Sequence, residues 1–252
     1  MPGRLSKEKL FARTKELLEF IYNFRYPVRE QIYRFGRIKW GVAQPRVFLE
    51  QCAKQGYLAA EKAGGIAPRL YQLTTAGKSY LGQLGSGFVQ RGKRVLRYDC
   101  FAHDTMVLEI YLKLLETFKE GTWLSDWRVR AMIRREHGLK ASRRAPDGIF
   151  TQGEQNLAVE FERTKKGKDR IGVLVGKYKR EFEKGYICGL LVITENKLFM
   201  ERLKKQISKG LIKWPEEKVI YGVWGTLEKG KAEHLGKEIG LGEIFKALKQ
   251  SQ

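Results

Sequence analysis

Three of the four carboxylates in the stretch PDGIFTQGEQNLAVEFE, at residues 146–162, have a spacing that could serve chemistry. Asp147 lies between a proline and a glycine, and Glu160 and Glu162 are separated by one residue. Hard divalent cations prefer carboxylate oxygens as ligands, and a metal-bound water can attack a neighbouring phosphodiester. We therefore predict that Asp147, Glu160 and Glu162 bind Mg²⁺ or Mn²⁺ and, if the chain cleaves a phosphodiester, act in catalysis.

The residues around these acids predict two paired strands, at 145–151 and 156–163. Side chains alternate across a strand, so Glu160 and Glu162 share one face while apolar residues occupy the other. The segment TQGEQN between the strands is typical of a tight turn. A hairpin of this kind places Asp147 beside the two glutamates.

Two lysines after the second strand are candidates to stabilise the charge that develops in a reaction. Lys165 follows the strand directly, and Lys177 lies in a predicted helix over 169–184. Glu109, in an amphipathic helix over 103–118, is a further candidate metal ligand. Two alternatives need no function. In one the acids form a solvated strand face, and in the other they pair with arginines, namely Arg143, Arg144 and Arg163.

The second half of the chain alternates between strand and helix patterns. Further strands are expected at 186–193 and 218–224, and further helices from Ser125 to Glu136, at 197–209 and at 241–249. Alternation of this kind is typical of an α/β layer with helices on the faces of the sheet. We expect the fold to be α/β, or α+β overall.

The first part of the chain has a different pattern. Apolar periodicity predicts helices at 6–23, 28–35 and 43–55. Strands at 57–62 and 69–73 follow around a Gly-Gly turn, and a helix starts at Thr74 or Thr75. Three helices followed by a two-stranded ribbon predict a winged helix, and residues 6–84 resemble many bacterial winged-helix proteins.

The charge of the chain favours a polyanionic partner. The formal net charge is +21, and residues 1–98 carry 19 Lys and Arg against 6 Asp and Glu. Double-stranded DNA is the partner we expect. The third helix of a winged helix enters the major groove. The candidates for base contacts are therefore Gln44, Arg46 and Gln51, and the candidates for phosphate contacts are Lys54, Lys62 and Arg69. A winged helix that contacts protein remains the alternative.

We expect a winged-helix domain at 1–84, a basic linker at 85–99 and an α/β domain at 100–252. The sequence has no apolar run long enough for a membrane span and no apolar leader segment. Its three cysteines are scattered, which favours a reducing compartment. We therefore expect a cytoplasmic protein without a membrane partner, and leave open whether it forms a homodimer.

Two resemblances add to this interpretation. Pro146-Asp147 and Glu160-Phe161-Glu162 resemble the PD-(D/E)xK nuclease motif, with Glu162 in place of the usual lysine. The order PDG, AVEFERTKK and GKYKREF after a winged helix is similar to the replication-relaxation family of plasmids and mobile elements. This resemblance implies a role in replication, mobilisation or recombination. If the chain is instead a non-catalytic accessory protein, we expect a relaxase or replication initiator as partner. If it is a transposon-type endonuclease subunit, we expect a recombinase.

Overall fold

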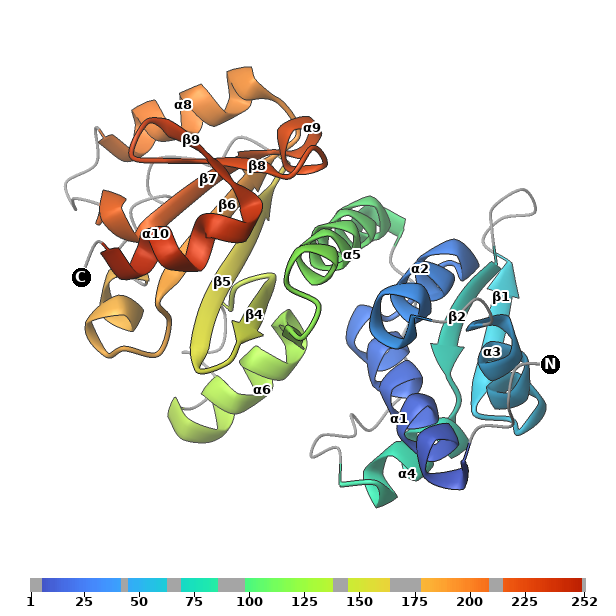
Figure 1. Ribbon diagram of the computed structural model, residues 1–252. Helices are drawn as coiled ribbons and strands as arrows, with labels where there is room; N and C mark the ends of the chain where they lie inside the picture. Colours follow the sequence, from blue (N-terminus) through green and yellow to red (C-terminus); the bar gives the residue numbers. More distant parts are fainter. Residues whose placement is uncertain are drawn as a thin grey trace. The chain divides into compact units, whose positions relative to one another are not determined.

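The computed structural model describes residues 6–41, 45–62, 69–85, 98–137, 145–163, 178–208 and 215–250 (Figure 1). The chain forms two compact units, residues 1–112 and 113–252. The division falls inside one long helix, α5 (Tyr98–Phe118). Each unit has its own sheet, so the two are described separately.

The first unit is built from helices around a two-stranded antiparallel sheet. Its elements are α1 (Lys7–Phe24), α2 (Arg29–Trp40), α3 (Pro45–Lys54), β1 (Leu58–Lys62), β2 (Arg69–Leu73), α4 (Thr75–Gln83) and the first part of α5. Ser6 caps α1 and Thr74 caps α4, because each side chain accepts a backbone N–H of the first turn. The pairing of Leu58 with Leu73 fixes the sheet register. These elements agree with the helices and strands predicted up to residue 84.

Aromatic stacking holds the helices of this unit together. Phe20 of α1 stacks on Phe35 of α2 with ring centroids 4.2 Å apart. Tyr111 of α5 stacks on Phe24 at 5.0 Å. The start of α5 therefore belongs to the first unit, whereas the sequence analysis began the second domain at residue 100. Most of the expected linker, residues 86–97, lies outside the described residues.

The second unit is built on a seven-stranded mixed sheet with strand order β3-β4-β5-β6-β7-β8-β9. The strands β3 to β5 and β7 to β9 are antiparallel, and β5, β6 and β7 are parallel. Their bounds are β3 (Thr122–Ser125), β4 (Gly148–Gln152), β5 (Gln155–Glu162), β6 (Gly189–Thr194), β7 (Val219–Val223), β8 (Lys231–His234) and β9 (Lys237–Gly240). The described part of the chain therefore has a mixed α/β fold.

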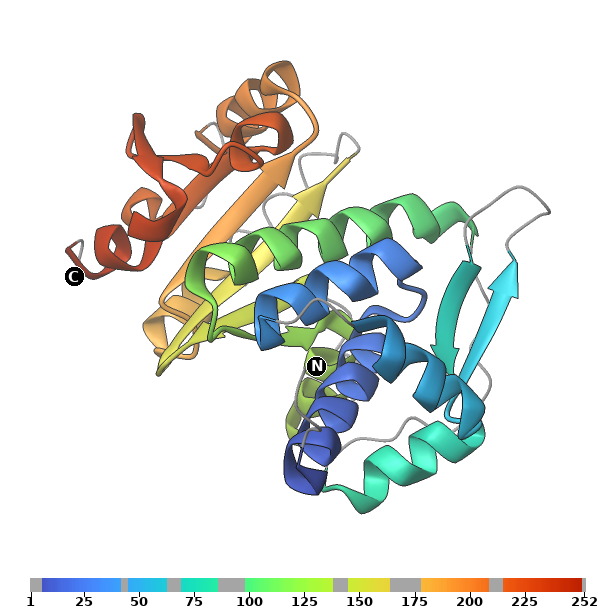
Figure 2. The ribbon, with the colours of Figure 1, turned by 45° about the vertical axis from the view of Figure 1, so that its right-hand side comes forward.

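Helices cover both faces of this sheet (Figure 2). On the face that contains Ala158 and Leu190, the core includes Tyr178 and Leu203. On the opposite face, Phe245 lies against Phe150, and Leu248 lies so close to Gly189 that a larger residue there would clash. The helical elements are α6 (Asp126–His137), residues 178–183, α8 (Lys197–Ser208), short helices at Glu216–Lys218, α9 (Trp224–Leu227) and Leu241–Glu243, and α10 (Ile244–Gln250).

The strands predicted from sequence are all present, with ends shifted by up to three residues. The tight turn between β4 and β5 is also observed, at Gly153-Glu154, where Gly153 has a φ of 58°. The strands β3, β8 and β9 and the short helix α9 were not predicted. Each of these strands has four residues, and β8 and β9 are too polar to show the apolar alternation of a half-buried strand.

Candidate carboxylate site

The register of the β4–β5 hairpin brings Asp147 to Glu160. Gly148 pairs with Val159 in an antiparallel register. Asp147, which precedes Gly148, therefore lies opposite Glu160, which follows Val159. The Phe161 backbone N–H donates a hydrogen bond of 2.8 Å to Asp147 Oδ2. The Asp126 N–H, at the start of α6, donates to the Asp147 carbonyl at 3.1 Å. Two backbone contacts therefore hold Asp147 at the edge of β5, as the sequence predicted.

Glu160 and Glu162 are buried, with exposed fractions of 6% and 4%. They lie on the same face of β5 as Ala158, below the helical residues 178–183 and α8. The alternative of a solvated strand face is therefore wrong. Arg163 does not take the role of partner, because its Nε donates to Glu195 Oε1 at 2.9 Å.

A tyrosine from the next helix completes the cluster. Tyr178 is 1% exposed, and its hydroxyl donates a hydrogen bond to Glu160 Oε1. Burial, then the charge and hydrogen bond of Glu160, and then the charges of Asp147 and Glu162 raise the pKa of Tyr178 well above its usual value. Tyr178 is therefore a protonated donor at neutral pH, and all three acids lie close enough to affect it.

The side chains of Asp147, Glu160 and Glu162 offer carboxylate oxygens, which are the ligands that hard cations prefer. Within the described residues, however, no group of three or more His, Cys, Asp or Glu side chains is arranged to hold a metal ion. One oxygen of each of two acids is already hydrogen-bonded within the protein: Asp147 Oδ2 accepts the Phe161 N–H and Glu160 Oε1 accepts the Tyr178 hydroxyl. Since Mg²⁺ often takes only one or two carboxylates, with waters and substrate phosphates completing its shell, Asp147 and Glu160 still fit such an ion.

Glu109 does not belong to this cluster. Its Oε1 accepts from Gln31 Nε2 and its Oε2 accepts from Arg34 Nη1, both at 2.7 Å. All three residues lie in the first unit. Glu109 therefore joins α5 to α2, and the idea that it completes a metal shell is not supported.

The other predicted residues are only partly described. Lys165, Lys177 and Gln44 lie outside the described residues, as does the side chain of Lys62. On α3, Lys54 is exposed and Gln51 is half-buried, and on β2 Arg69 is exposed.

Arg46 is exposed as well, but it is engaged within its own helix. Its Nε donates to Glu50 Oε1 at 2.6 Å. This hydrogen bond and the charge of Glu50 raise the pKa of Arg46. A base contact by Arg46 that keeps this hydrogen bond would therefore have to use its Nη atoms.

Tyr178 is a participant that the sequence did not mark as a site residue; it stands in the segment GKYKREF. Its hydroxyl was the one available signal, because a buried phenol needs a hydrogen-bond partner. The strand before it supplies two buried acids as acceptors. Which acid it meets depends on the parallel crossover from β5 to β6, which sequence periodicity does not show.

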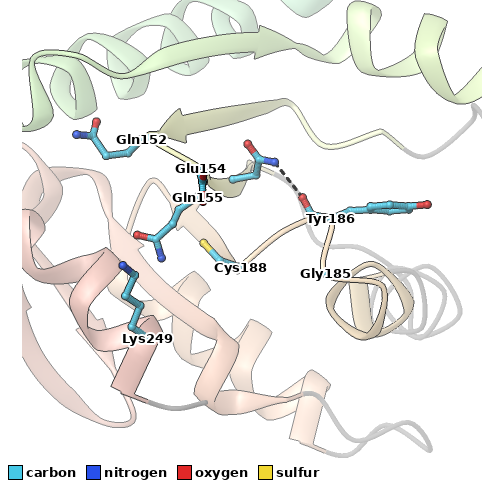
Figure 3. A pocket seen from close by; sticks show the side chains of 9 residues that line it. Gln152, Glu154, Gln155, Gly185, Tyr186, Cys188 and Lys249 are labelled. Atoms are coloured by element: carbon cyan, nitrogen blue, oxygen red, sulfur yellow. Dashed lines mark hydrogen bonds between the residues drawn. The ribbon is translucent and has the colours of Figure 1, made fainter.

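A polar pocket of about 460 Å³ lies at the other end of β5, around the Gly153-Glu154 turn (Figure 3). Gln155, Cys188 and Lys249 line it, and Asn156 Nδ2 donates to the Tyr186 carbonyl at 3.2 Å beside it. Burial raises the pKa of the Cys188 thiol to about 11, so this thiol is not a reactive thiolate at neutral pH. This pocket lies at the end of β5 opposite Glu160 and Glu162 and does not form part of the carboxylate cluster.

Comparisons with protein-family models, curated proteins and solved structures found no match to this chain. A membrane-spanning helix is absent from the described residues, where no helix combines the length and apolar character that a crossing requires.

Proposed function

We propose that this chain binds duplex DNA and cleaves its backbone with the help of a divalent cation held at Asp147 and Glu160. The observation that carries the proposal is the burial of Glu160 and Glu162 beside Asp147 in a chain with a net charge of +21. Burying ionised carboxylates is unfavourable unless they are paired or bind a cation. A buried cluster of acids that contacts Tyr178 and raises the pKa of its hydroxyl is a candidate functional site.

The order of the elements supports a PD-(D/E)xK nuclease core in the second unit. In chain order these elements are a helix (α5), a strand (β3), the helix α6, two strands beside the acids (β4 and β5), a helix (178–183) and a parallel strand (β6). The helix α6 is additional to the order helix, strand, paired strands, helix and strand of the nuclease core. The departure is Glu162, which stands where the motif has lysine. We assign the missing positive charge to Lys165 or Lys177.

In this proposal the residues of the chain have separate tasks. Tyr178 fixes the orientation of Glu160 through the hydrogen bond that its hydroxyl donates. The Phe161 N–H does the same for Asp147. A bound Mg²⁺ or Mn²⁺ would supply an activated water and neutralise phosphate charge. A lysine near the phosphate would stabilise the charge that develops as the P–O bond breaks.

The first unit supplies DNA binding in the proposal. Its three helices and two-stranded sheet have the order of a winged helix. Gln51 and Arg46 on α3 are then near the bases, and Lys54 and Arg69 contact phosphates. The binding should weaken steeply with salt, because each phosphate contact releases a counterion.

A non-catalytic accessory protein is the second candidate. The hydrogen bond that Tyr178 donates to Glu160 favours it, because this bond already occupies one oxygen of that carboxylate. The resemblance to the replication-relaxation family would place either activity at a plasmid or mobile-element origin in the cytoplasm. A relaxase, replication initiator or recombinase would be the partner there.

Nicking of supercoiled plasmid with Mg²⁺ or Mn²⁺ tests the proposal. The double variant Asp147→Asn/Glu160→Gln removes two charges at nearly constant volume. The variant Glu195→Gln is the control, because Glu195 is an exposed acid after β6 that pairs only with Arg163 at the surface. We expect metal-dependent nicking by the wild type and by Glu195→Gln, and none by the double variant, with DNA binding retained by all three. Binding without nicking by the wild type would favour the accessory role.

A further inference from the structure

The helix α6 carries an unusual density of arginines. Four occur within eight residues, at Arg128, Arg130, Arg134 and Arg135, with no acid between Asp126 and Glu136. Arg134 and Arg135 are exposed. Arginine forms bidentate contacts with phosphate and stays charged at any physiological pH, so this surface suits a polyanion.

Little in the described structure neutralises these charges. Arg128, Arg134 and Arg135 have no ion pair with any described residue. Arg130 has its Nε 3.5 Å from Asp126 Oδ2, within its own helix. The Nε atoms of Arg128 and Arg130 are buried without a hydrogen-bond acceptor among the described residues. The positive charge of this helix is therefore left largely uncompensated within the described structure.

The orientation of the helix is fixed by packing. Trp127 and Val129 are buried, and the helix contacts β3 and β4 (Figure 1). The arginines at the far end therefore project from the surface while the apolar residues face the sheet. A binding surface on this helix would need no rearrangement of the fold.

The start of α6 lies directly beside the carboxylate cluster. Ser125, the residue before the helix, pairs with Gly148. The Asp126 N–H donates to the Asp147 carbonyl at 3.1 Å. With a rise of 1.5 Å per residue, Arg134 and Arg135 lie about 12–14 Å further along the axis. That distance corresponds to about four nucleotides at 3.4 Å per step of one strand.

We propose that α6 binds the phosphate backbone of the DNA that enters the carboxylate cluster, as a second contact surface separate from the first unit. This inference rests on the proposed function, because it concerns the same DNA. It assigns to the second unit its own contribution to affinity. It also names Arg134 and Arg135 as the outer phosphate contacts, a few nucleotides from Asp147.

Salt-dependent binding of a fluorescent duplex to the full chain, measured by anisotropy, tests the inference. The variant Arg134→Gln/Arg135→Gln removes two exposed charges. The control Lys197→Gln/Arg202→Gln removes two exposed charges from α8, which packs on β6 and β7 instead. The slope of log K against log salt is negative, and the loss of two phosphate contacts should make it less steep by about 1.8. We expect this change, with affinity at least about tenfold weaker near 100 mM salt, in the α6 variant and not in the α8 control.

Each outcome has a separate meaning. If the wild type binds no DNA, the proposed function fails and the inference fails with it. If the wild type binds and the α6 variant keeps both its affinity and its slope, the inference is overturned while the proposed function stands. An equal loss in the α6 and α8 variants would also overturn it, because the effect would then follow net charge and not this surface. The conservative variant Arg134→Lys/Arg135→Lys should retain most of the salt slope.

Discussion

The hydrogen bond between Tyr178 and Glu160 can be tested by a double-mutant cycle. Tyr178→Phe removes the hydroxyl that donates to Glu160 Oε1, and it leaves the ring in place. Glu160→Gln replaces the charged acceptor with a neutral amide of similar shape. If the buried phenol serves the carboxylate, the cost of losing the hydroxyl should depend on whether Glu160 is charged.

The magnitude follows from the burial of both groups, which are 1% and 6% exposed. A hydrogen bond to a charged group contributes about 1.5–3 kcal/mol to stability, and one to a neutral group about 0.5–1.5 kcal/mol. We therefore expect Tyr178→Phe to lower the free energy of unfolding by about 1.5–3 kcal/mol in the wild-type background. In a background that already carries Glu160→Gln, the same change should cost about 1 kcal/mol less.

Urea denaturation at pH 7.5 measures these free energies. Tyr221→Phe is the matched control, because Tyr221 packs against the same core cluster but its hydroxyl has no hydrogen bond to a carboxylate among the described residues. Val192 lies between Glu160 and Tyr221 in the sheet, which separates them by about 9.6 Å at the usual strand spacing. This control should be additive with Glu160→Gln. A coupling below about 0.3–0.5 kcal/mol for Tyr178 would refute the reasoning.

Two further predictions concern the first unit. Glu109→Gln should lower its stability by about 1–3 kcal/mol, because Arg34 loses a charged acceptor at 2.7 Å; urea unfolding checks this, and an unchanged midpoint would show that the ion pair contributes nothing. Burial raises the pKa of Cys52 from 9.0 to about 11. The stability from this thiol is therefore full below pH 9 and is lost as the pH rises toward 11, by up to about 3 kcal/mol. Unfolding between pH 8 and pH 11 should show a shallower loss for Cys52→Ala, and equal slopes would contradict this.

The fold was predictable where periodicity is strong. The helix predicted at 6–23 is α1 and the strand predicted at 156–163 is β5, because a consistent apolar face specifies both the element and its orientation. Prediction failed at β8 and β9, where four-residue polar strands show no such face. The strand β8 pairs with the edge of β7, and β9 pairs with β8, so both depend on the assembled sheet.

The candidate site divides in the same way. The sequence by itself determined that Glu160 and Glu162 share one face of a strand, since side chains alternate along any strand. It also placed Asp147 beside them, since a two-residue turn sets the register of the hairpin.

Only the tertiary structure decided that this face is buried and that Tyr178 donates to Glu160. It also decided that the arginine-bearing α6 begins beside Asp147, through the Asp126 N–H, and that Glu109 binds α2 instead. These facts depend on parallel crossovers and on helix packing between residues far apart in the chain. Local periodicity carries no information about such contacts, because they arise only when separate elements pack together.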